Sequence, residues 1–169
     1  MSAYGAQVTK QFVTELVRCG YCIVSGLAVG VDALAHITAI TEGGKTIAVL
    51  AHGLDYCYPI EHKKLKQEIL DTGGLLASVY PEGNRPIREQ FFVRNELLVK
   101  LSDVVLVTCS PHKSGVKNTV KHAAELGRDV YVIPGPVDDP SYAGIVEIIE
   151  NGGILVRSPE DLIRNLNNN

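Results

Sequence analysis

The chain has 169 residues and carries 16 Lys and Arg against 19 Asp and Glu, which gives a formal net charge of -3 at pH 7. This length fits one domain with its own core, and 46% apolar with 21% charged residues excludes a disordered or fibrous chain. The acidic balance argues against a bulk-charge coat on nucleic acid, because non-specific binding is chiefly phosphate neutralisation by Lys and Arg. Any nucleic-acid site must therefore be a local patch.

Helical and strand patterns alternate along the chain, and glycines stand where several helices are expected to end. In chain order we predict helix 4–19, strand 21–24, helix 30–42, strand 46–50, helix 60–71, strand 75–78, helix 88–101, strand 104–107, helix 116–126 and strand 130–133. Short apolar strands between amphipathic helices indicate a mostly parallel sheet covered on both faces. The predicted fold class is α/β: a doubly wound, Rossmann-like, three-layer α/β/α domain at 1–157, followed by a C-terminal helix and tail at 158–169.

The chain begins with a helix, although a domain of this kind usually opens with a strand whose following loop binds phosphate. We therefore expect that the first strand is missing or that the sheet starts one strand short. Two stretches rich in Pro and Gly, 80–87 and 134–141, follow strand ends. Ligands bind at that edge of open parallel sheets, so function is expected there.

Sequence patterns for export, metals and catalysis are missing. The first ten residues have neither a basic nor an apolar targeting region, and no run of 18 apolar residues occurs, so we expect a cytoplasmic protein without a membrane partner. Cys19 closes a predicted helix and Cys22 lies in the strand that follows, whereas a redox Cys-x-x-Cys pair normally opens a helix. We interpret all four cysteines as small buried hydrophobes. The histidines lack metal-ligand spacing and there is no Gly-x-Ser-x-Gly elbow, so we predict no metal, no cofactor and no enzymatic activity.

Two loops that lead from a strand into a helix are candidates for anion binding. Ser25 and Gly26 follow a predicted strand, and a helix N-terminus with free backbone N–H groups favours negative charge there. The loop is neither G-x-G-x-x-G nor a P-loop, so a plain tight connection is the alternative. In the second loop Lys113, Ser114 and Gly115 precede a helix, and the alternative is a solvated helix face capped by Ser114.

The stretch 85–95 combines cations with aromatic rings. Arg88, Phe91 and Arg94 or Asn95 recur at helical spacing, so a cation and a ring can share one face. This pairing suits single-stranded nucleic acid, whose bases stack on aromatic or Arg planes while basic groups hold the phosphates. The alternative is that one Phe packs into the core and the arginines face solvent.

Taken together, these segments resemble the DNA-processing protein A family, called DprA or Smf. The resemblance rests on the Ser-Gly-Leu-Ala-x-Gly-x-Asp-x-x-Ala-His run at 25–36, on Phe-x-x-Arg-Asn at 91–95 and on Ser-Gly at 114–115, and it extends over 4–153. Members of the family bind single-stranded DNA during natural transformation, load the bacterial recombinase onto it and dimerise through this domain. The resemblance implies the same partners here and a non-catalytic DNA pocket formed by Ser25, Gly26, Arg88, Phe91, Arg94, Asn95, Lys113, Ser114 and Gly115.

The chain also departs from the family pattern. The family's first strand and its Gly-x-Arg loop would lie before Met1, and Glu96 stands where the family usually has a second Arg. Phe92 replaces a Pro, and charge at Lys117 stands where the family buries apolar residues. The expected consequence is a weakened affinity for DNA.

Two other functions stay open at the level of sequence. Related folds cleave nucleoside monophosphates or sense nucleotides, but the phosphoribohydrolase pattern Pro-Gly-Gly-x-Gly-Thr is not continued at Pro134-Gly135-Pro136. A diverged remnant with weak DNA binding is the third hypothesis, favoured by the missing first strand.

Overall fold

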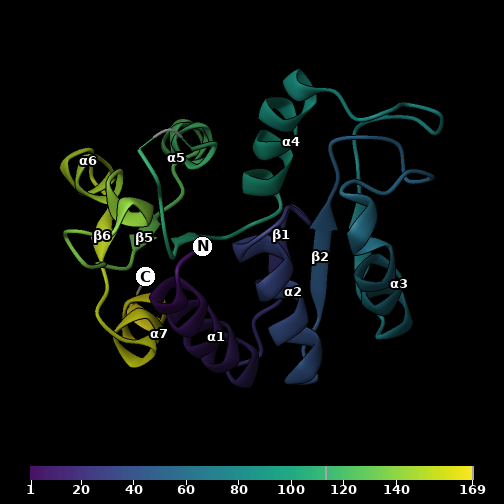
Figure 1. The fold of residues 1–169 in the computed structure, drawn as a ribbon. Helices are drawn as coiled ribbons and strands as arrows, with labels where there is room; N and C mark the ends of the chain where they lie inside the picture. The colour runs from purple at the N-terminus through teal and green to yellow at the C-terminus, as the bar shows by residue number, and fades with distance from the viewer. Residues whose placement is uncertain (113, 169) are drawn as a thin grey trace.

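The computed structural model describes residues 1–112 and 114–168, in which helices alternate with short strands (Figure 1). The predicted α/β class is confirmed, and α6 and β6 are elements that the sequence patterns did not predict. In chain order the elements are α1 (Ala3–Arg18), β1 (Ile23–Ser25), α2 (Val31–Thr41), β2 (Thr46–Val49), the 3₁₀ helix η1 (Ile60–His62), α3 (Lys63–Asp71), β3 (Leu75–Ala77), α4 (Arg88–Lys100), β4 (Val105–Val107), α5 (Val116–Glu125), β5 (Val130–Val132), the 3₁₀ helix η2 (Pro140–Tyr142), α6 (Ile145–Glu150), β6 (Ile154–Leu155) and α7 (Pro159–Asn168).

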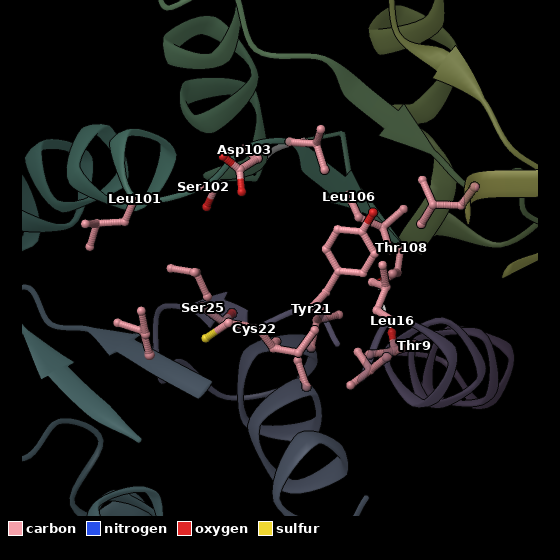
Figure 2. A pocket seen from close by; sticks show the side chains of 18 of the residues that line it. Thr9, Leu16, Tyr21, Cys22, Ser25, Leu101, Ser102, Asp103, Leu106 and Thr108 are labelled. Carbon is pink, nitrogen blue, oxygen red and sulfur yellow. Dashed lines mark hydrogen bonds between the residues drawn. The ribbon is translucent and has the colours of Figure 1, made fainter. Parts of the chain in front are cut away.

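The strands form two parallel sheets of three strands each, in the orders β1-β2-β3 and β4-β5-β6. Val24 lies opposite Ile47 in the first sheet, and Leu106 lies opposite Tyr131 in the second. Parallel pairing is what a chain that returns through a helix after each strand requires. The doubly wound arrangement is therefore present as two halves, and β1 of one half faces β4 of the other across a cavity (Figure 2).

Successive residues of each strand point to opposite helical layers. In the second half, Val105 and Val132 pack with α4, α5 and α6, whereas Leu106 and Tyr131 pack with α1 and α7. In the first half, Ala48 packs with α2 and α3, and α4 contacts β2. Helices cover both faces of the strands, as the near-continuous apolar character of the strand sequences predicts.

Helix α7 packs on the rest of the chain, because Leu162 is buried in one cluster with Val8 and Phe12 of α1. The domain boundary at residue 157 stays a prediction. Within residues 1–112 and 114–168, no helix combines the length and the apolar character that crossing a bilayer requires.

The expectation of buried cysteines was wrong. Cys19 and Cys22 are exposed, while Cys57 and Cys109 are half-buried. Cys19 caps the C-terminus of α1, and Cys22 lines the cavity beside the open edge of β1. Their exposure follows from these positions at a helix end and at an uncovered strand edge.

Candidate nucleic-acid interface

The loop after β1 is closed by an acidic residue of helix α2. Gly26 and Ala28 both donate their backbone N–H groups to Asp32 Oδ2, at 3.2 Å each. Between them Leu27 is fully buried and has a φ of 62°, a left-handed conformation that is uncommon outside glycine. The Asp32 carboxylate therefore accepts hydrogen bonds from two of the backbone amides that we expected to be free for an anion. A phosphate at this loop needs other donors.

His36, one helical turn beyond Asp32, lies in the core. Its Nδ1 is 2.7 Å from Thr46 Oγ1, and Thr46 donates its hydroxyl hydrogen to Ile23 O at 2.7 Å. Because Thr46 has no second hydrogen to donate, His36 donates from Nδ1, and its buried Nε2 lacks a hydrogen-bond partner within the described residues. Burial lowers the pKa of His36 to about 4, so the ring is neutral at pH 7.

Arg94 joins helix α4 to the ends of β1 and β2. Its side chain is buried, with 5% exposure, and Nη1 donates to Gly26 O at 2.5 Å and to Val49 O at 2.7 Å, while Nε donates to Asn95 Oδ1 at 3.1 Å. Burial lowers the pKa of the guanidinium, and the nearby charge of Asp32 opposes that shift. Arg94 is thus a positioning residue: it fixes α4 and the loop after β1 relative to each other.

Phe91 lies one turn before Arg94 on α4 and contacts both a cation and a second ring. The Arg94 Cζ atom is 5.7 Å from the centre of the Phe91 ring. Tyr58 meets Phe91 edge-on, with ring centres 5.7 Å apart and an interplanar angle of 67°. Phe91 is half-buried, whereas Tyr58 is 52% exposed. The pair presents aromatic surface to solvent beside a fixed positive charge.

Tyr58 was missed by the sequence reasoning, although a signal for it exists. Tyr56 and Tyr58 lie in a Pro-containing connection that follows β2, which is the sheet edge where function was expected. Arg85 donates from Nε to Tyr56 Oη at 3.4 Å, and Arg88 is exposed at the start of α4, three residues before Phe91. We call Tyr56, Tyr58, Arg85, Arg88 and Phe91 the aromatic–arginine surface.

The second predicted loop is tied to α4 through Asn95. The Asn95 side chain is 9% exposed, and Nδ2 donates to Gly115 O at 3.5 Å. Gly115 is the N-cap of α5, and Ser114 turns its hydroxyl to Ser110 Oγ at 3.3 Å instead of capping the helix. Lys113 lies outside the described residues.

The structure brings most of the predicted site residues together. Gly26, Arg94, Asn95 and Gly115 form one hydrogen-bonded chain across the strand ends, with Phe91 packed on Arg94. Ser25 lines the cavities between the two sheets. Arg88 is exposed at the start of α4, and Ser114 directly precedes Gly115 and contacts Ser110.

Glu96 on α4 stands where the family usually has an arginine, and its side chain pairs with Lys100 of the same helix. Its Oε1 lies 2.6 Å from Lys100 Nζ, and this ion pair lowers the pKa of Glu96. Both side chains are about half exposed, so screening by solvent keeps the pair weak. In the part of the chain that the structure describes, no three or more His, Cys, Asp or Glu side chains form a cluster able to hold a metal ion.

Parallel strands covered by helices define a Rossmann-like α/β protein, and the candidate interface lies at the carboxyl edge of the strands. Residues 1–167 match the family model described as DNA recombination-mediator protein A, and the chain belongs to this family. It is 40% identical over 163 residues to Protein Smf of Synechocystis sp., covering 96% of this chain and 41% of that protein.

Two solved structures are similar throughout this chain. The X-ray structure of DNA processing protein A from Streptococcus pneumoniae has a TM-score of 0.89 and 37% identity, and the match covers 97% of this chain and 57% of that one. The Helicobacter pylori DNA processing protein A, whose structure is described for its single-stranded DNA binding mode, has a TM-score of 0.88 and 32% identity, covering 98% and 75%. The chain spans about half the length of the curated relatives that it matches.

Proposed function

We propose that this chain binds single-stranded DNA on the aromatic–arginine surface, as a non-catalytic module in DNA processing. The observation that carries the proposal is the Tyr58–Phe91 pair beside the Arg94 guanidinium, with ring centres 5.7 Å apart. Bases stack on such rings regardless of sequence, while cations hold the phosphates. Family membership and the single-strand binding mode described for the Helicobacter pylori relative support the same function.

Each residue has a distinct role in this proposal. Phe91 and Tyr58 stack on bases, and the exposed Arg88 contacts phosphate together with Lys113, Ser114 and the amide of Gly115. The other predicted residues hold the site in position: Ser25, Gly26, Arg94 and Asn95. Gly26, Arg94 and Asn95 already form hydrogen bonds within the chain. A local patch of this kind is compatible with the net charge of -3.

The wider role follows from the family. We propose that the protein acts in the cytoplasm during natural transformation, that it forms a homodimer, and that it delivers single-stranded DNA to the bacterial recombinase. The competing hypothesis of a nucleotide-derived ligand at the Ser25-Gly26 loop is disfavoured, because Asp32 already occupies the amides of Gly26 and Ala28.

The test is a fluorescence anisotropy titration of a labelled oligothymidine with the wild-type chain and three variants. Phe91→Ala and Tyr58→Ala each remove one stacking ring, and a stacked base is worth about 1 to 3 kcal/mol, so we expect Kd to rise about 5- to 150-fold. Phe92→Ala is the matched control, because Phe92 is the next residue on α4 and is 47% exposed; its Kd should stay within about twofold of wild type. Equal Kd values for Phe91→Ala and Phe92→Ala would remove the proposed site.

A further inference from the structure

Lys66 of helix α3 binds the connection that carries Tyr58. Its ammonium donates to Leu54 O and to Tyr56 O, at 2.6 Å each, so two carbonyls of one short segment converge on a single cation. Hydrogen bonds from a charged donor are about twice as strong as bonds between neutral groups. The Lys66 side chain is half-buried, which partly shields both bonds from water. We call residues 53–58 the tyrosine loop.

The tyrosine loop is bonded on its other side to the connection that leads into α4 (Figure 1). Asp55 accepts the Gly83 N–H with both carboxylate oxygens, at 3.0 Å each, and Gly53 donates its N–H to Asn84 O at 2.9 Å. Asn84 is in turn held by α4, because Gln90 Nε2 donates to Asn84 Oδ1 at 2.6 Å. The loop is therefore attached to α3 by one lysine and to α4 through a chain of hydrogen bonds.

The placement of the Tyr58 ring depends on the path of this loop. Lys66 engages main-chain carbonyls and leaves the rings free: Tyr58 is 52% exposed and meets Phe91 edge-on, with ring centres 5.7 Å apart. A side chain that is half exposed has few packing contacts of its own to fix its position. Without the Lys66 bonds the loop would visit more conformations, and only a fraction of them would place Tyr58 beside Phe91.

A lysine beside a DNA surface can also hold a phosphate directly, and the geometry of Lys66 argues against that role. Two of the three N–H donors of its ammonium are bonded to carbonyls of the chain. Lys64, on the same helix, shows the opposite arrangement: its side chain is 89% exposed and lies 3.5 Å from Glu68. The Lys66 ammonium is therefore directed to the tyrosine loop and not to solvent.

We propose that Lys66 is a positioning residue for single-stranded DNA: its ammonium holds the tyrosine loop in the conformation that places Tyr58 beside Phe91, without touching the DNA. The inference rests on the proposed function, because it concerns the stacking site formed by these two rings. It makes the affinity for DNA depend on a residue outside the aromatic–arginine surface. Since Lys66 acts through Tyr58, its removal can weaken binding by no more than removal of the Tyr58 ring.

The test combines Lys66→Met with Tyr58→Ala in the anisotropy titration of a labelled oligothymidine. Methionine keeps the apolar stem and removes the donors, and the core contacts of α3 come from Leu65 and Ile69, so the variant should keep its fold. If Tyr58 is in place for about a tenth to a third of the time, Kd rises about 3- to 10-fold. In the Tyr58→Ala chain, Lys66→Met should change Kd by less than about twofold.

Lys64→Met is the matched control, because it removes the same charge from the same helix at an exposed position. Its Kd should stay within about twofold of the wild-type value. The slope of log K against log salt should be equal for Lys66→Met and wild type, whereas the loss of a phosphate contact would reduce it by about 0.7. Without DNA, the NMR cross-peaks between the Tyr58 and Phe91 rings should weaken in Lys66→Met and persist in Lys64→Met.

Four results would overturn the inference while Tyr58→Ala still weakens binding, so that the proposed function stands. They are an unchanged Kd for Lys66→Met, an equal rise of Kd with and without the Tyr58 ring, a reduced salt slope, and undiminished cross-peaks between Tyr58 and Phe91. The proposed stacking site fails in a different way: Tyr58→Ala and Phe91→Ala would then bind as tightly as wild type, and the inference would fall with it.

Discussion

Substituting Gly26 tests whether the buried cation of Arg94 joins helix α4 to the ends of β1 and β2. A Cβ at Gly26 would overlap the guanidinium of Arg94, and Gly26 is not among the positions with positive φ, so the backbone itself accepts alanine. Gly26→Ala therefore displaces Arg94 from the carbonyls of Gly26 and Val49. Hydrogen bonds to a charged group are worth about 1.5 to 3 kcal/mol each, and with partial compensation by water we expect the free energy of unfolding to fall by about 2 to 4 kcal/mol.

The assay is urea unfolding of wild type, Gly26→Ala, Arg94→Ala and the double variant, followed by circular dichroism. Because both single changes break the same bonds, Gly26→Ala should cost less than about 1 kcal/mol once Arg94 is alanine. Gly115→Ala is the control glycine, since the nearest atom to its Cβ would be 3.9 Å away, and it should cost at most about 1 kcal/mol. Fully additive losses in the double variant would refute the role assigned to Arg94.

Two further predictions concern neighbouring residues. Because burial lowers the pKa of His36 to about 4 in the folded chain, against about 6.5 when unfolded, the unfolded state binds the extra proton between these values. The free energy of unfolding should therefore have its full value above pH 6.5 and fall by roughly 3 kcal/mol as the pH drops to 4. The variant His36→Asn keeps a donor for Thr46 and should flatten this part of the plot of urea midpoint against pH. An unchanged plot would contradict the assignment to His36. Asp32→Ala should lower the free energy of unfolding by about 1 to 3 kcal/mol, because two loop amides lose their acceptor. Asp32→Asn keeps an acceptor oxygen and should lower it by less. Equal losses of the two variants in urea unfolding would show that the carboxamide cannot replace the carboxylate.

The regular elements were predictable because periodicity and glycine positions are local properties of the sequence. Helix α6 and strand β6 were missed, since six and two residues are too few to display a period. The sequence names several residues that the fold brings together, Gly26, Phe91, Arg94, Asn95 and Gly115, but it does not show the contacts that each of them makes. The sequence places Arg94 beside Phe91, yet only the fold shows the guanidinium turned inward to backbone carbonyls.

Contacts between residues far apart in the sequence could not be predicted from local patterns either. Asp32 was recognisable as an acidic residue in the first turn of α2, but its bonds to Gly26 and Ala28 depend on how the loop after β1 turns back. Tyr58 reaches Phe91 from 33 residues earlier in the chain, through a connection whose path no periodic pattern encodes. The sequence therefore did not predict the contacts that depend on tertiary packing.

The most direct measurement of the proposed function is the affinity of the wild-type chain for one oligonucleotide in single-stranded and in duplex form, at two salt concentrations. Stacking on Phe91 and Tyr58 needs exposed bases, so we predict a lower Kd for the single strand. Raising the salt should weaken binding, with log K falling by about 0.7 per phosphate contact for each unit of log salt concentration. Equal affinity for the two forms, or binding to neither, would contradict the account.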